Sequence, residues 1–179
     1  FDFINKKKLD LFFFKINFIG TQIPFSRNMQ NNKQKVNYFN ANSCLSSAMW
    51  INKKCRKILY FDEKYGLGTK YGSGEETDFV FKSLQLNKKI FYNPEIIIYH
   101  PKEFEINSSL KKIYTKFYSY GLGQGALPRK YLKNNFYLFL FIFLISLFKS
   151  ILANFYYLIK IDKNNLAKHF ALLKGKING

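Results

Sequence analysis

The chain has 179 residues, of which 29 are Lys or Arg and 11 are Asp or Glu, giving a net charge of +18 and a pI near 9.8. Only three basic residues are arginine, the side chain on which sequence-specific nucleic-acid readers depend for bidentate base contacts, so we expect no nucleic-acid partner. The two cysteines, Cys44 and Cys55, fit no zinc pattern and are too few for a disulfide scaffold. We expect both thiols to be reduced and buried.

The N-terminal part predicts an α/β arrangement. Residues 9–19 and 36–41 are rich in Phe, Ile, Val and Tyr, which favours two strands, with a polar loop at 24–35 between them. The mixed segment 46–55 predicts a short helix or turn. The chain opens on Phe1 rather than Met, and we expect it to be a natural truncation or a partial sequence.

A glycine-rich loop is expected at 64–74, followed by a helix and an extended segment. Ser73 is a candidate cap, and Glu75, Glu76 and Asp78 would fill the first turn of the helix. Residues 88–100 predict a pair of strand segments broken at Pro94.

From residue 106 the sequence becomes helical in pattern. Ile106, Leu110, Ile113 and Phe117 recur at helical spacing among exposed lysines, so 106–135 predicts a basic amphipathic helix and a hinge. The helix either lies on anionic lipid or packs against a core. Residues 120–130, YGLGQGALPRK, lack the G-x-G-x-x-G spacing of a dinucleotide loop, and we predict the hinge there.

The segment 136–160 is the strongest membrane signal. Residues 136–159 would form a helix about 36 Å long, enough to cross a hydrocarbon core of roughly 30 Å. Sixteen Leu, Ile or Phe residues favour insertion by roughly 5–10 kcal/mol, against about 3 kcal/mol for Lys149. Lysines flank both ends, so a transmembrane span and a helix dipping in from one face both remain open, as does a buried soluble helix. The tail, 161–179, predicts a further amphipathic helix.

Negative charge is concentrated at one place. Five of the eleven acids lie between Asp62 and Asp78. Carboxylates at a helix N-terminus complement the helix dipole, which is one explanation. The other is catalytic, because a carboxylate beside a flexible loop is well placed to accept a proton from a bound hydroxyl.

The order of motifs resembles the C-terminal half of family 2 glycosyltransferases. The matching stretches are FDEKYG at 61–66, GSGEETDFVFK at 72–82 and NKKIFYNPEIIIYHP at 87–101, preceded by SSAMWINKK at 46–54. Together they cover about residues 36–105. Lys82 stands where the family usually has Arg, and Glu76 where it more often has Asp.

The resemblance implies a GT-A fold, an α/β sandwich, over residues 1–105. It implies inverting transfer of a sugar from a nucleotide-sugar donor to a hydroxyl of a glycan or lipid-linked acceptor. By position, Glu76 would be the general base, while Glu75 and Asp78 would shape the acceptor pocket or fix the loop. Asp78 is equally open as a simple first-turn acid. Trp50 would stack on a sugar or pack in the core, and His100 would help hold a metal ion or close a strand.

The resemblance also implies a partner half. The family binds its donor and a divalent cation, Mg²⁺ or Mn²⁺, through an N-terminal unit with a D-x-D motif, and no D-x-D occurs in these 179 residues. We therefore predict that the chain alone is inactive. The leading hypothesis is a membrane-associated glycosyltransferase with a cytoplasmic catalytic part, acting in surface polysaccharide biosynthesis. The alternative is a non-catalytic basic membrane-associated protein.

Overall fold

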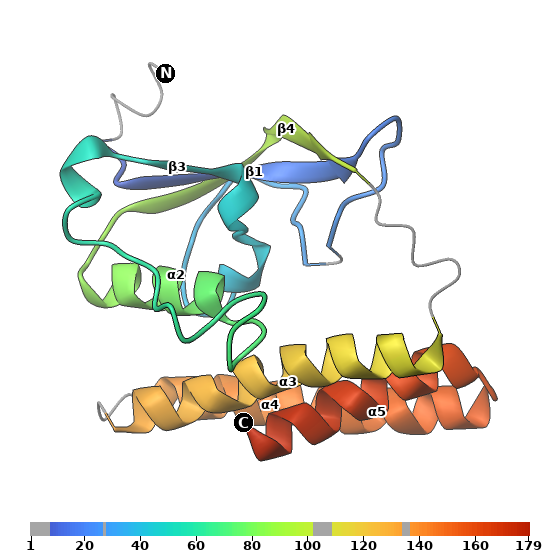
Figure 1. Ribbon diagram of the computed structural model, residues 1–179. Coiled ribbons are helices and arrows are strands. Elements are labelled where there is room, and N and C mark those ends of the chain that lie inside the picture. The colour runs from blue at the N-terminus through green and yellow to red at the C-terminus, as the bar shows by residue number, and fades with distance from the viewer. Residues whose placement is uncertain (1–7, 27, 102–108, 134–136) are drawn as a thin grey trace. The chain divides into compact units, whose positions relative to one another are not determined.

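The computed structural model describes residues 8–26, 28–101, 109–133 and 137–179. The chain forms two compact units, one comprising residues 1–61 and 76–104, the other 62–75 and 105–179. The first is a mixed α/β unit and the second is helical (Figure 1). The predicted α/β class is confirmed, and the glycine-rich loop belongs to the helical unit.

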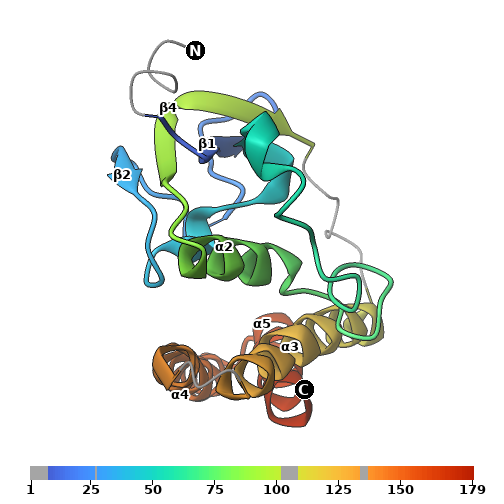
Figure 2. The same ribbon diagram turned by 90° about the vertical axis from the view of Figure 1, so that its left-hand side faces the viewer.

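The α/β unit is built on a four-stranded mixed sheet in the order β2-β4-β1-β3. Its strands are β1 (Leu11–Phe18), β2 (Gln34–Lys35), β3 (Met49–Ile51) and β4 (Ile90–His100). Strand β4 runs parallel to β1, whereas β3 pairs antiparallel with β1 and β2 pairs antiparallel with β4. Helix α2 (Glu75–Gln85) runs along one face of the sheet (Figure 2).

Strand β1 forms the centre of this unit because its side chains are buried on both faces. Leu11, Phe12, Phe13 and Ile16 are at most 2% exposed. Such a strand reads as a continuous apolar run in the sequence, which is why the prediction for 9–19 is confirmed.

The strand predicted at 36–41 is wrong. The side chains of Asn37 and Asn40 accept hydrogen bonds from the backbone in this segment. The Phe39 N–H donates to Asn37 Oδ1 at 2.8 Å, and the Asn37 N–H donates to Asn40 Oδ1 at 2.7 Å. These side-chain bonds offer the backbone a turn instead of a sheet ladder. The pairing residues are Gln34 and Lys35, just before this turn.

The predicted break at Pro94 is a bulge within one strand. The pairing of β1 with β4 jumps from Phe14↔Asn93 to Lys15↔Ile97. Proline has no N–H to donate to a ladder, and an irregularity in the pairing accommodates it.

The helical unit contains α3 (Leu110–Leu132), α4 (Tyr137–Ile159) and α5 (Lys163–Asn178), which lie side by side (Figure 1). Ile106, part of the predicted amphipathic pattern, lies outside the described residues. The hinge predicted at 120–130 is wrong, because this segment continues α3 without a break.

The glycines of α3 serve close packing rather than bending. A Cβ on Gly121 would lie 2.4 Å from Leu172 O, and one on Gly125 would lie 2.2 Å from Lys176 O, both on α5. Gly175 on α5 faces Tyr118 O in the same way. Small residues four apart let two helix backbones approach this closely. Gly123 lies on the other side of α3, where a Cβ would clash with the Ser73 backbone.

Helix α4 is long and apolar enough to cross a membrane. It has 23 residues, and within it an 18-residue stretch has a mean hydropathy of 2.2, of which only 11% is buried within the protein. Among the described residues α4 is the one helix that meets this test. The long apolar helix predicted at 136–160 is thus present at Tyr137–Ile159.

Candidate active site

Glu76 lies in the first turn of α2 and is anchored by Ser46. Glu76 Oε1 accepts the Ser46 backbone N–H at 2.6 Å and the Ser46 hydroxyl at 2.7 Å. Ser46 is exposed and Glu76 is half-buried, so this contact borders solvent. Two donors on one oxygen fix the direction of the carboxylate.

A tight apolar hollow adjoins Glu76. Its walls are Phe13 of β1, Met49 of β3, Phe61 and Phe79, and it has no volume accessible to a water molecule. Phe61 stacks on Phe79 with ring centroids 4.6 Å apart. In this structure the hollow beside Glu76 is therefore too tight to admit an acceptor.

The side chains of Glu75 and Glu76 contact different parts of the chain although the two residues are neighbours in sequence. The Glu75 side chain folds back toward the glycine-rich loop, where a Cβ on Gly66 would lie 3.4 Å from Glu75 Cδ. Gly66 has a φ of +111°, a conformation that only glycine adopts easily. Glu75 therefore contacts the loop that precedes α2.

Asp78 does not line an acceptor pocket. It is fully buried, at 0% exposure, and pairs with Lys82 one turn later at 3.1 Å. A side chain without exposed surface cannot touch an acceptor, so the predicted substrate role is corrected to a structural one. The acid and the base four residues apart in the motif form a helical ion pair.

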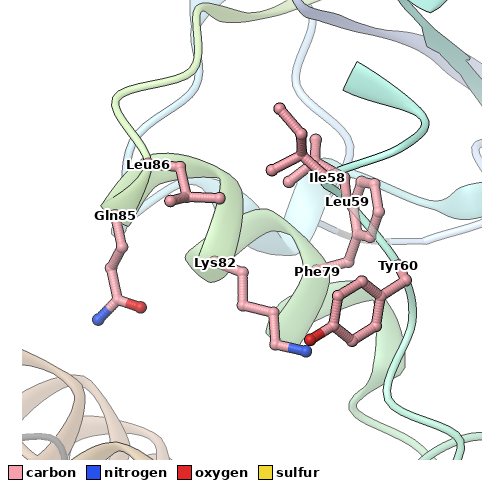
Figure 3. Close-up of a pocket in the computed structure, with 7 residues that line it drawn as sticks. All are labelled: Ile58, Leu59, Tyr60, Phe79, Lys82, Gln85 and Leu86. Carbon is pink, nitrogen blue, oxygen red and sulfur yellow. The ribbon is translucent and has the colours of Figure 1, made fainter. Parts of the chain in front are cut away.

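Lys82 also lines a cavity of about 260 Å³ between α2 and residues 58–60 (Figure 3). Its ammonium lies 4.8 Å from the centre of the Tyr60 ring. The remaining walls are mostly apolar, with Gln85 as the other polar member. The sequence did not predict this cavity, because Ile58 and Tyr60 belong to none of the motifs that resemble the glycosyltransferase family.

Trp50 lies on the opposite face of the sheet from Glu76. Met49 and its partner Phe13 border the hollow beside Glu76, and successive residues of a strand point to opposite faces. Trp50 accordingly packs against Leu9 and Phe12. This placement favours packing over sugar stacking beside Glu76, and the stacking role stays a prediction.

His100 ends β4, as expected, but does not join a group of metal ligands. Its Nδ1 lies 2.8 Å from Pro101 O and its ring packs edge-on against Phe25 at 4.8 Å. Across the described part of the chain, no three His, Cys, Asp or Glu side chains gather as a metal site.

The FDE turn is tied to α3 inside the helical unit. Lys130 donates to Asp62 Oδ2 at 2.7 Å, and Asp62 Oδ1 accepts the Lys64 N–H. Ser73 was expected to cap α2, but its hydroxyl donates instead to Tyr120 O at 2.8 Å. The glycine-rich loop is thus fastened to α3 near both of its ends.

Comparison with known proteins leaves the family resemblance as a hypothesis. No family model, no curated protein and no solved structure matched the chain.

Proposed function

We propose that the chain is the acceptor-side part of an inverting family 2 glycosyltransferase that works at a membrane, with Glu76 as the general base. The single observation that carries the proposal is the anchoring of Glu76 by Ser46 at the first turn of α2. The order of the FDE, glycine-rich, acidic and P-x-x-x-x-x-H segments supports the choice of family. The mixed α/β unit and the apolar helix α4 agree with it.

In this proposal, the acceptor hydroxyl attacks the anomeric carbon of a nucleotide sugar. A bond forms between that oxygen and the carbon, and the bond from the carbon to the nucleoside diphosphate breaks. The hydroxyl proton passes to the carboxylate of Glu76. Attack opposite the leaving group inverts the anomeric configuration.

The role of Ser46 is to position the base. By donating to Oε1, Ser46 fixes the direction of the Glu76 carboxylate, and the carboxylate itself accepts the proton. The side chains of Phe13, Met49 and Phe61 must part before an acceptor reaches Glu76 from the side of the apolar hollow. Access from the exposed side of Ser46 needs no such movement.

A divalent cation belongs to the proposed complete enzyme, where it would stabilise the departing diphosphate. Its D-x-D ligands are not among these 179 residues, and His100 lies against Phe25 rather than in a ligand cluster. No step of the reaction as written here passes through the metal.

The test is Glu76→Gln in the full-length enzyme, compared with Glu75→Gln as the matched neighbour. Loss of the base should lower kcat by about 10²- to 10⁴-fold with little change in donor KM. Glu75→Gln should stay within about tenfold of the parent enzyme, because Glu75 contacts the loop. Ser46→Ala should lower kcat less than Glu76→Gln, because it misaligns the base without removing it. Equal activity of Glu76→Gln and the parent would reject the assignment.

The second candidate is a non-catalytic, basic, membrane-associated protein. The specific observation in its favour is the closed hollow at Glu76, where the carboxylate joins α2 to residue 46 across 30 residues of sequence. Under this alternative, Glu76→Gln lowers the stability of the α/β unit, and full-length protein transfers no sugar with any donor.

A further inference from the structure

Helix α4 has a polar face and an apolar face on opposite sides, although the helix as a whole is strongly apolar. Ser146, Ser150 and Asn154 recur every four residues and form a polar stripe, in which Ser150 is 5% exposed. Phe141, Phe148 and Phe155 recur every seven residues on the other side and are 56%, 61% and 61% exposed. At about 100° per residue, the phenylalanines lie roughly opposite the stripe.

The polar stripe is covered by α5. Lys176 Nζ donates to Ser146 Oγ at 2.9 Å, to Ser146 O at 3.2 Å and to Ser150 Oγ at 2.7 Å. Farther along, Tyr157 of α4 stacks on His169 of α5 with centroids 4.9 Å apart. The two helices are therefore antiparallel, and Lys176 lies beside the middle of α4.

This packing opposes a simple transmembrane span. If α4 crossed a bilayer with α5 attached, Lys176 would lie near the centre of the hydrocarbon. One lysine at that depth offsets the insertion preference of about five to ten leucines. Lys149, also near the middle of α4, would oppose insertion in the same way.

The same arrangement suits a helix that lies flat. Lys149 of α4 and Lys160, which directly follows the helix, are both exposed. They are eleven residues apart, which is about three helical turns, and the Lys160 N–H still donates to Tyr156 O, so both lie on about the same side of the helix axis. That side lies between the phenylalanine face and the polar stripe, at the flank of a helix lying flat, where lysine ammonium groups reach lipid headgroups while apolar side chains enter the acyl region.

We propose that α4 is an in-plane membrane anchor: its phenylalanine face enters one leaflet of an anionic bilayer while α5 covers its polar stripe. The occupant is lipid rather than a second copy, because the +18 charge of the chain and the lysines beside the face attract anionic headgroups and would repel another chain. The anchor does not depend on the proposed transferase activity.

The test measures depth at three positions of the full chain. Single cysteines replace Phe141, Phe148 or Phe155, each labelled with a small fluorophore, in vesicles of anionic and zwitterionic lipid that carry bromine at known acyl positions. The buried Cys44 and Cys55 should label little, and the parent chain measures that background. Asn164→Cys, exposed at the start of α5, is the control for a group outside the bilayer.

An in-plane helix predicts equal, shallow quenching at all three positions and none at 164. A span predicts that position 148 lies about 10 Å deeper than 141 and 155, since seven residues rise about that far. That profile would overturn the proposal. Protection of all three labels in a protein dimer, without quenching by lipid, would also overturn it.

The lysines supply an independent measurement. Lys149→Gln and Lys160→Gln should each weaken binding to anionic vesicles about fivefold and leave binding to neutral vesicles unchanged. Both side chains are exposed, so the variants should fold. Unchanged binding to anionic vesicles would contradict the assigned orientation of α4.

Discussion

Lys176→Met tests how α4 and α5 are held together. Lys176 is 5% exposed, and burial lowers the pKa of its ammonium from 10.5 to about 8. Below pH 8 the lysine is charged in both the folded and the unfolded chain, and above pH 10.5 it is neutral in both. Between these values the unfolded chain binds more protons, so the free energy of unfolding rises with pH.

The gap between a pKa of 10.5 and one of about 8 corresponds to about 3 kcal/mol. The parent helical unit should therefore gain up to about 3 kcal/mol between pH 8 and pH 10.5. Methionine fills a similar volume but carries no proton, so Lys176→Met should remove this gain. Lys174→Met, at an exposed position two residues earlier on α5, is the control and should retain it.

The assay is denaturant unfolding in mild detergent, followed by far-UV circular dichroism as a function of pH. Trp50, the single tryptophan, lies in the α/β unit, so its fluorescence reports that unit separately. Parent stability that does not change between pH 8 and pH 10.5 would refute the reasoning. So would an equal loss of pH dependence in both variants.

Three other predictions concern packing and reactivity. Gly121→Ala should lower the melting temperature of the helical unit, because the added methyl group would clash with Leu172 O on α5. The clash costs about 1–3 kcal/mol and outweighs the gain in helix propensity of about 1 kcal/mol. A higher melting temperature would contradict this. Lys82→Met should destabilise the α/β unit by about 3 kcal/mol because it removes the ion pair between Lys82 and the buried Asp78. Adding Asp78→Asn should restore part of the loss, and equal stability of all three proteins in urea would refute this. Burial raises the pKa of the Cys44 thiol, so maleimide should label it far more slowly than free cysteine at pH 7.5, and fast labelling of the folded chain would be the contrary result.

The sequence predicted the elements whose residues form strong local patterns. The apolar run of β1, the acidic start of α2 and the long apolar helix α4 all stand near their expected positions. Residues 36–41 were mispredicted because two asparagine side chains replaced strand pairing with a turn. The glycines of α3 resembled a hinge, and only the approach of α5 shows why they are small.

The candidate site was partly predictable for a similar reason. Glu76 stands out through its motif, whereas its partner Ser46 is 30 residues away and depends on tertiary folding. Trp50 was left open between sugar stacking and packing because strand register decides the orientation of a side chain, and register is not visible in a three-residue strand. Full burial of Asp78 likewise follows from packing and not from its position in the helix.

The most direct test of the central claim, that Glu76 is the proton acceptor, is the pH dependence of kcat in the full-length enzyme. The parent should lose activity toward acid pH as the base becomes protonated, while Glu76→Gln should show a low rate without that acid limb. A Glu76→Gln enzyme with undiminished kcat and the same acid limb would contradict the claim.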